Sequence, residues 1–307
     1  MTHPALGART RIVQSPANRW VKALRAALLR PPALAQSQHP GGNPSLIALE
    51  GYHLLAEALR TGLAPAAIFL RGGQESQTLR TLEDALGAHC AKHPAKPARA
   101  SSPIAVPAEA ELLVLPPTLF QNIVETETPQ PIAALLAAPL AEPESIVSGP
   151  SPLVLVLASI QDPGNVGALL RSAEAFGATG ALLLSGTATP WSSKALRASA
   201  GSALRVPMRA VGNAEAAATL LRAHAIPSYA AVPADGTAVD QIPLHRPAAL
   251  WIGNEGAGLG PAELAACDAR VTLPMPGRTE SLNAAIAGSL LLYEASRQRG
   301  PRASNPV

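Results

Sequence analysis

Short apolar runs separated by helical patterns dominate the second half of the chain. Strand-like runs lie at Leu153–Leu157, Ala181–Leu184, Ser228–Val232, Ala249–Ile252 and Val271–Leu273. A last helix is expected from Ser281 to about Arg299, with an apolar face formed by Ile286, Leu290 and Tyr293. Apolar strands that alternate with helices are typical of a mostly parallel sheet covered on both faces. The pattern therefore predicts an α/β domain over residues 153–299.

The first half of the chain shows a weaker form of the same alternation. Ser15 followed by Pro16 predicts a helix start, with serine as the cap and proline in the first turn. Further segments read as strands at Leu46–Leu49 and Ala66–Leu70, and as helices at Gly51–Arg60, Leu79–Leu86 and within Ala108–Val124. These segments indicate a small α/β unit.

Two proline-rich stretches without periodicity suggest where the domains meet. Residues 31–44 are rich in Pro, Gly and Gln, and residues 137–152 contain four prolines. We therefore expect an N-terminal arm, helix and linker over 1–44, a first domain over 45–136, a linker over 137–152, and the second domain over 153–299.

Composition supports two packed domains and argues against a membrane role. The 307 residues exceed the usual size of one core, and 48% of them are hydrophobic against 15% charged. No apolar run approaches the ~18 uncharged residues of a membrane span. Two isolated cysteines, Cys90 and Cys267, suggest neither a disulfide framework nor a metal site, and they fit a reducing cytoplasm.

Basic residues are concentrated in the first 49 positions, which contain no Asp or Glu. They are Arg9, Arg11, Arg19, Lys22, Arg25 and Arg30, and a second group follows at Lys92, Lys96 and Arg99. Such a distribution favours attraction to the phosphates of a nucleic acid. A solvated helix face and an organellar transit peptide are the alternatives that the composition leaves open.

The segment "LASIQDPGNVGALLRSAEAFGA" contains a strand end, a turn and a helix start. Residues 162–164 form the turn, and the helix is expected to begin near Asn165. Asn165 and Arg171 lie six positions apart, about 600° around a helix, so they do not share a face. They converge only if Asn165 sits in the cap region. A plain asparagine cap with a surface arginine is the alternative.

The segment "LWIGNEGAGLG" places a glycine-rich loop after an apolar strand. The dinucleotide fingerprint fails, because Pro261 stands where the third glycine after Gly256 and Gly258 is needed. Glu255 is then either a structural acceptor for backbone amides or a carboxylate of a site.

The segment "VTLPMPGRTESLNAAIAGSLLLYEASRQR" joins a strand that ends at Pro274 to a helix that opens around Ser281, Leu282 and Asn283. Small residues from Ala284 to Gly288 permit a close backbone approach. Taken alone, Ser281 reads as an ordinary helix cap.

Together these three segments resemble the SpoU (TrmH-like) family of the SPOUT methyltransferase superfamily, in the family's order and spacing. The resemblance covers about residues 153–299 and includes "SSKALRASAGSALRVPM" from Ser192 to Met208. The N-terminal part is more loosely similar to a substrate-binding domain with the fold of ribosomal protein L30e, chiefly through "IALEGYHLLAEAL" from Ile47 to Leu59.

The resemblance implies a fold, a cofactor and a set of site residues. The C-terminal domain would form a deep trefoil knot, bind S-adenosylmethionine, and methylate a ribose 2′-hydroxyl of RNA as a homodimer. Residues that would line the cofactor site are Gly253, Leu273 and Leu282. Residues that would carry the catalysis are Arg171, Asn165, Glu255, Ser281 and Asn283. The two-domain layout resembles members that act on rRNA, which favours rRNA over tRNA.

The chemistry of Arg171 leaves two roles open. A guanidinium with a pKa above ~12 is a weak base on its own, so either an RNA phosphate assists it as it takes the hydroxyl proton, or it only positions phosphate and hydroxyl. Three other functions are kept as alternatives: a catalytically silent RNA-binding or assembly protein with the same fold, a base methyltransferase, and a nucleotide-dependent oxidoreductase. The missing glycine fingerprint counts against the last.

Overall fold

The structure is a computed structural model that describes residues 10–35, 45–92, 110–124 and 129–300. For residues 88–92 it describes the backbone but not the side chains. The predictions for Arg9, Lys96 and Arg99, and for the side chains of Cys90 and Lys92, lie outside the described residues. Contacts divide the chain into two compact units. Unit 1 comprises residues 1–32, 40–139 and 191–204, and unit 2 comprises 33–39, 140–190 and 205–307.

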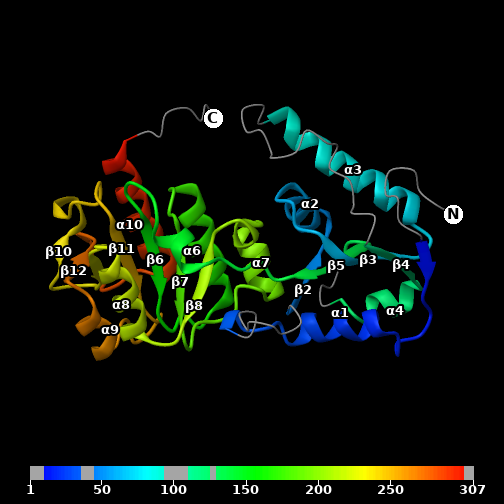
Figure 1. Cartoon of the computed structure of the whole chain (residues 1–307), viewed down its shortest axis with the longest axis horizontal. Coiled ribbons are helices and arrows are strands. Elements are labelled where there is room, and N and C mark those ends of the chain that lie inside the picture. Colours follow the sequence, from blue (N-terminus) through cyan, green and yellow to red (C-terminus); the bar gives the residue numbers. More distant parts are fainter. Residues whose placement is uncertain (1–9, 36–44, 93–109, 125–128, 301–307) are drawn as a thin grey trace. The chain divides into compact units, whose positions relative to one another are not determined.

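Unit 2 contains a seven-stranded sheet in the order β10-β12-β9-β11-β6-β7-β8 (Figure 1). The strands are β6 (Leu153–Leu157), β7 (Gly180–Leu184), β8 (Met208–Val211), β9 (Ser228–Ala231), β10 (Thr237–Ala238), β11 (Ala248–Ile252) and β12 (Ala269–Thr272). Each neighbouring pair among these strands is parallel. The predicted α/β class with a mostly parallel sheet is therefore confirmed.

Helices cover both faces of this sheet. The elements are α5 (Pro143–Val147), α6 (Pro163–Ala175), α8 (Ala214–Ala223), η3 (Val239–Gln241), α9 (Pro261–Ala266) and α10 (Ala284–Arg299). Helices α5, α8 and α9 pack with Val154, Val156 and Trp251 in one core. A Cβ placed on Gly288 of α10 would lie 2.4 Å from Leu169 Cδ2 of α6 and 3.2 Å from Ile252 Cγ1. Because Ile252 follows Trp251 in β11, α6 and α10 cover the opposite face.

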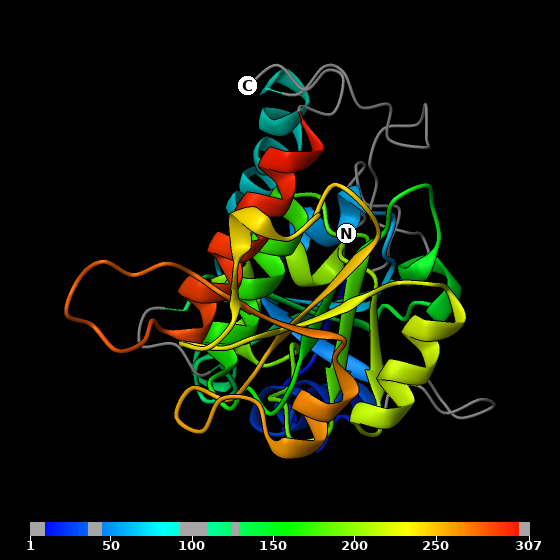
Figure 2. The same ribbon diagram turned by 90° about the vertical axis from the view of Figure 1, so that its left-hand side faces the viewer.

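Helix α10 differs from its prediction in two ways. It begins at Ala284, and its cap is Asn283 rather than Ser281. Its predicted apolar face is exposed in the single chain, with Ile286, Leu290 and Tyr293 at 53%, 42% and 52% of full exposure. Its small residues and two leucines make the buried side, which consists of Ala284, Ala285, Gly288, Leu291, Leu292 and Ala295. In Figure 2 the chain between β12 and α10, drawn orange to red, runs out as a wide loop before it returns.

Unit 1 has a five-stranded mixed sheet in the order β1-β4-β3-β5-β2. Its elements are β1 (Thr10–Ile12), α1 (Arg19–Leu29), β2 (Leu46–Glu50), α2 (Tyr52–Arg60), β3 (Pro65–Arg71), α3 (Glu75–Lys92), β4 (Glu111–Leu115), α4 (Pro117–Gln121), β5 (Ile132–Ala137), α7 (Ser193–Ser199) and η2 (Ser202–Leu204). Strand β5 is antiparallel to β2 and β3, whereas β1, β4 and β3 are parallel.

Two helix predictions in unit 1 are wrong. Helix α1 begins at Arg19, and its cap is Asn18, whose Oδ1 accepts from Trp20 N at 2.9 Å, so Ser15 is not the cap. The predicted helical region 108–124 is described from residue 110 on, and in this part residues 111–115 form strand β4 while only 117–121 are helical. The four-residue apolar run from Leu112 to Leu115 does not distinguish strand from helix by itself, and pairing with both β1 and β3 decides for the strand.

Two segments take places that the sequence pattern does not indicate. Residues 143–147, inside the stretch expected to be a linker, form α5, whose Ile146 and Val147 are buried. Residues 191–204 lie between β7 and β8 in the sequence but belong to unit 1, and they bury Trp191 and Leu196. Among the described residues, no helix is long and apolar enough to cross a membrane.

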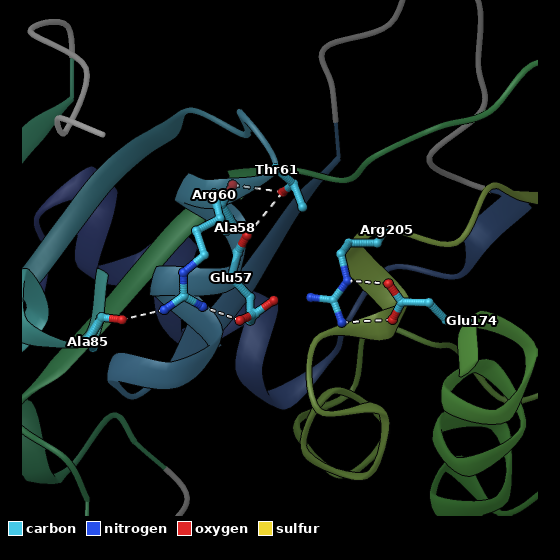
Figure 3. A network of polar contacts seen from close by, with 7 residues as sticks. All are labelled: Glu57, Ala58, Arg60, Thr61, Ala85, Glu174 and Arg205. Atoms are coloured by element: carbon cyan, nitrogen blue, oxygen red, sulfur yellow. Dashed lines mark hydrogen bonds and ion pairs between the residues drawn. The ribbon is translucent and has the colours of Figure 1, made fainter. Parts of the chain in front are cut away.

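Ion pairs of different burial occur within each unit (Figure 3). In unit 1, Arg60 of α2 pairs with Glu57 and donates to the carbonyl of Ala85, which ties α2 to α3. The side chains of this pair are only 14% and 10% exposed. In unit 2, Arg205 donates through Nε and Nη2 to the two carboxylate oxygens of Glu174, at 2.6 and 2.8 Å.

Candidate active site

The three segments selected from the sequence meet beyond the carboxyl ends of parallel strands in unit 2. They are the turn after β6, the glycine-rich loop after β11 and the loop between β12 and α10. The carboxyl ends of strands in such sheets are where ligands commonly bind. Hydrogen bonds between side chains join these loops, although they are about 90 to 120 positions apart in the sequence.

Glu255 of the glycine-rich loop holds the turn after β6. Its Oε2 accepts from Gln161 N at 3.1 Å, and its Oε1 accepts from Asp162 N at 3.1 Å and from Asn165 Nδ2 at 2.9 Å. Partial burial raises the pKa of Glu255, but hydrogen bonds from Asn165 and from backbone amides, those of Gln161 and Asp162 among them, outweigh this effect and leave the pKa below its ordinary value. The carboxylate is therefore ionised near neutral pH and accepts from all three donors.

Asn165 and Asn283 extend this connection to the third segment. Asn165 lies in the first turn of α6, whose cap is Asp162. Its Oδ1 accepts from Asn283 Nδ2 at 3.2 Å, while Asn283 Oδ1 accepts from the amides of Ala285 and Ile286 at the start of α10. Glu255, Asn165 and Asn283 thus form one chain of hydrogen bonds that crosses all three loops.

Arg171 stands apart from this chain of hydrogen bonds. It lies further along α6 and its side chain is exposed. No residue that the structure describes forms a hydrogen bond or an ion pair with its guanidinium. Asn165 is near the helix start, as convergence requires, but the structure joins Asn165 to Glu255 and Asn283 and not to Arg171.

A cavity of about 220 Å³ lies between the loops after β9, β11 and β12. Five of the predicted residues line it, namely Gly253, Glu255, Leu273, Ser281 and Leu282. The sequence pattern did not single out several further lining residues, among them Val232, Asn254, Met275 and Leu291. Asn254 lies within the glycine-rich loop and Val232 ends a predicted strand, so the sequence located both residues. It did not indicate that they line the cavity.

Gly253 marks the tightest backbone packing at the cavity. The loop from Asn254 to Gly258 folds back through two backbone hydrogen bonds, Asn254 N to Gly258 O at 3.0 Å and Gly258 N to Asn254 O at 2.9 Å. A Cβ on Gly253 would lie 2.3 Å from the Gly258 carbonyl carbon and 2.4 Å from Leu259 N. Glycine is therefore required for the loop to close against the end of β11.

The cavity wall combines apolar side chains with backbone polar groups. Glu255 is the ionisable side chain that the described part of the chain contributes to it. Such a wall suits a ligand with a flat or aliphatic apolar part and polar edges that backbone groups can bind.

Comparisons with known proteins point to one family. The model described as the SpoU rRNA Methylase family matches residues 152–293. RlmP of Bacillus subtilis, named as a 23S rRNA guanosine 2′-O-methyltransferase, is 36% identical over 174 residues, which are 57% of this chain and 68% of that protein. An uncharacterized tRNA/rRNA methyltransferase from Synechocystis is 38% identical over 150 residues, and the chain thus spans 39% of the length of that relative and 68% of the length of RlmP.

Solved structures match over nearly the whole chain. The SpoU methyltransferase AviRb from Streptomyces viridochromogenes, in complex with the cofactor AdoMet, is 25% identical with a TM-score of 0.72, covering 92% of this chain and 98% of that chain. An AdoMet-bound rRNA methyltransferase from Sinorhizobium meliloti is 27% identical with a TM-score of 0.70, covering 94% of this chain and 98% of that chain.

Proposed function

Because the chain belongs to the SpoU rRNA methylase family, we propose that it is an S-adenosylmethionine-dependent RNA methyltransferase that acts on a ribose 2′-hydroxyl. Family membership confirms the resemblance predicted from the three segments. The observation that carries the proposal is the cavity lined by Gly253, Glu255, Leu273, Ser281 and Leu282, next to the hydrogen-bonded chain that ends at Asn283.

The residues at the cavity fit S-adenosylmethionine. Leu273 and Leu282, with Val232 and Ile252, offer apolar surface to an adenine ring, and the backbone of the loops after β11 and β12 offers groups to its polar edges. The close packing behind Gly253 keeps the loop backbone at the cavity wall. When bound, S-adenosylmethionine supplies an activated methyl group. The cofactor-bound AviRb and Sinorhizobium structures support this assignment.

The polar side chains have separable roles in our proposal. Glu255 stays ionised and orients the amide of Asn165, which in turn orients Asn283 at the start of α10. These amides and Ser281 would hold the ribose so that its oxygen is in line with the methyl carbon. Arg171, exposed and unpaired among the described residues, is available for an RNA phosphate.

A pH-rate profile of Arg171→Lys separates the two roles of this residue. If the guanidinium takes the hydroxyl proton with help from an RNA phosphate, replacement by lysine shifts the profile as well as lowering the rate. If Arg171 only positions phosphate and hydroxyl, the rate falls and the profile keeps its shape.

Helix α1 is our proposed contact for the RNA backbone, and rRNA our preferred substrate over tRNA. Arg19 pairs with Glu111 and lies 4.9 Å above the Trp20 ring, whereas Lys22 and Arg25 are exposed. Replacing Lys22 and Arg25 by alanine should weaken RNA binding and reduce its dependence on salt, while cofactor affinity is unchanged. An unchanged salt dependence would exclude α1 as a contact.

We also propose that the enzyme is a homodimer in which α10 is covered. Its exposed Ile286, Leu290 and Tyr293 lie on one side of the helix, and Tyr293 packs edge-on against Phe176, the C-terminal cap of α6, with ring centroids 5.6 Å apart. Leu290→Glu should shift the mass measured by sedimentation from two chains to one.

Three finer features complete the proposal: a trefoil knot at the C-terminal end of unit 2, an L30e-like fold for unit 1, and a cytoplasmic location. The return of the loop after β12 into α10 supports the knot. A knotted chain pulled from both ends should extend less than its full contour length.

Methyl transfer decides between the enzyme and the catalytically silent alternative. Purified protein is incubated with ribosomal RNA and S-adenosylmethionine carrying a labelled methyl group, with Asn283→Ala as the inactive control. Alkaline digestion should leave the label in resistant dinucleotides, because 2′-O-methylation blocks cleavage. Label in ordinary mononucleotides would indicate base methylation, and affinity for RNA without any affinity for the donor would indicate a silent RNA-binding protein.

A further inference from the structure

The side chain of Asn254 joins the cavity loop to the turn after β6 at a point that Glu255 does not reach. Its Nδ2 donates to the carbonyl of Ser159 at 3.0 Å, and its Oδ1 accepts from the amides of Gly256 and Ala257 at 2.9 and 3.0 Å. One half-buried carboxamide therefore closes its own loop through the oxygen and holds a second loop through the nitrogen.

Ser159 has a backbone conformation that requires such support. Its φ is 57°, in the left-handed region that a serine rarely adopts. Its amide donates to Thr187 Oγ1 at 3.1 Å, and that hydroxyl donates to Leu157 O at 2.9 Å. The Ser159 residue is thus held from both sides, by Thr187 at its N–H and by Asn254 at its C=O. A strained residue of this kind persists only where its surroundings determine its conformation.

The turn at Ser159 sets the direction of the chain that carries the proposed catalytic side chains. Two residues later the amides of Gln161 and Asp162 are bound by Glu255, and Asn165 follows in the first turn of α6. Adjacent residues of the cavity loop therefore hold this turn at two successive points. Asn254 itself lines the cavity. Both contacts therefore connect the cavity loop to the segment that leads into α6.

We infer that Asn254 is a positioning residue, whose amide N–H fixes the turn at Ser159 so that Asn165 and α6 are aligned with the methyl donor in the cavity. The inference rests on the proposed function. It assigns no contact with substrate to Asn254. Loss of the Asn254 amide should lower kcat, because an error of about 1 Å in the alignment of the reacting groups costs on the order of 100-fold in rate.

Two variants of Asn254 remove the hydrogen-bond donor Nδ2 and keep an oxygen that accepts a hydrogen bond. Asn254→Asp is nearly isosteric, and Asn254→Ser keeps a neutral oxygen that can accept from Gly256 N in the same turn. We expect both to reduce kcat by roughly 30- to 100-fold with the dissociation constant of S-adenosylmethionine within about threefold of wild type. Asn213→Asp is the matched control, because Asn213 caps α8 through an acceptor that aspartate also provides.

Rescue separates positioning from a general loss of structure. Glycine adopts positive φ without steric cost, so Ser159→Gly in the Asn254→Ser background should recover about tenfold in kcat. Thr187→Val, which removes the other support of Ser159, should lower kcat without changing donor affinity, and its effect should not add to that of Asn254→Ser.

Amide exchange tests the inference independently of catalysis. Exchange over residues 160–165 should be about tenfold faster in Asn254→Ser than in wild type and unchanged in Asn213→Asp. The inference would be overturned if amide exchange were unchanged and kcat stayed within about threefold of wild type in both Asn254 variants. It would also be overturned if the affinity for S-adenosylmethionine fell in parallel with kcat. Failure of the proposed function would have a different signature. The wild-type protein would transfer no methyl group, while amide exchange over residues 160–165 would still be faster in Asn254→Ser than in wild type.

Discussion

Gly253→Ala is the sharpest test of how the cavity loop is built. The new methyl carbon would lie 2.3 Å from the carbonyl carbon of Gly258. Ordinary carbon contacts are about 3.5 to 4.0 Å, so the backbone of the loop must move by more than about 1 Å. The atoms in the way are backbone, and a side-chain rotation does not relieve the clash.

The cost follows from what the movement disrupts. Overpacking of this kind costs roughly 1 to 3 kcal/mol, and each of the two hydrogen bonds between Asn254 and Gly258 contributes about 1 kcal/mol. If the movement breaks both hydrogen bonds, we expect unit 2 to lose about 3 to 5 kcal/mol of unfolding free energy. Binding of S-adenosylmethionine should weaken at the same time, because the displaced loop forms the cavity wall.

Urea unfolding followed by Trp251 fluorescence measures this change. Trp251 is fully buried in unit 2, and replacing Trp20 and Trp191 by phenylalanine in both parent and variant leaves it as the reporter. Gly256→Ala is the control in the same loop, because its Cβ would lie 3.6 Å from Asn254 Oδ1, and it should stay within about 0.5 kcal/mol of the parent. Equal stability of parent and Gly253→Ala, or equal damage from both substitutions, would refute the reasoning.

Three further predictions concern ionisable groups. Hydrogen bonds hold the pKa of Glu255 below its ordinary value in the folded protein. Its contribution to stability is therefore complete above the pKa that Glu255 has in the unfolded chain, and it is lost as pH falls through the folded-state pKa. The urea midpoints of wild type and Glu255→Gln should converge as the pH is lowered from 7 to 3. Burial raises the pKa of Cys267 to about 12, so alkylation at pH 8 should be at least about tenfold slower in native protein than in urea, as followed by mass spectrometry of its peptide; equal rates would contradict the burial. Glu57→Gln removes the charged partner of the poorly exposed Arg60 and should lower the free energy of unfolding in urea by about 2 to 4 kcal/mol. Glu174→Gln, in a pair whose side chains are 26% and 36% exposed, should lower it by no more than about 1 kcal/mol. A reversed order would show that burial does not control the contribution of these pairs.

The sequence alone determined the α/β fold class and the family resemblance, and it selected five of the residues that line the cavity. Strand β6 has the predicted bounds, and β7 and β11 each differ by one residue, because central strands of a parallel sheet are buried on both faces and are apolar throughout. The order and spacing of the three loop segments carried the family resemblance, which the comparisons confirm. The roles of Arg171, Asn165, Glu255, Ser281 and Asn283 remain predictions.

Tertiary structure decided whatever depends on a distant partner. Strand β4 was predicted to be helical because its four apolar residues, Leu112–Leu115, are ambiguous until β1 and β3 pair with the strand. The apolar stripe of α10 was visible, but only packing against α6 and β11 shows that the small residues face inward.

The contacts of the site are the clearest case of such dependence. Glu255 could be a structural acceptor or a site carboxylate until the fold placed it within 2.9 Å of Asn165, 90 positions earlier. Asn254 gave no signal of its own, because its partner, Ser159, lies 95 positions earlier, in the turn after β6. Local sequence determines apolar periodicity and turns, whereas hydrogen bonds between loops exist only after the sheet has brought the strand ends together.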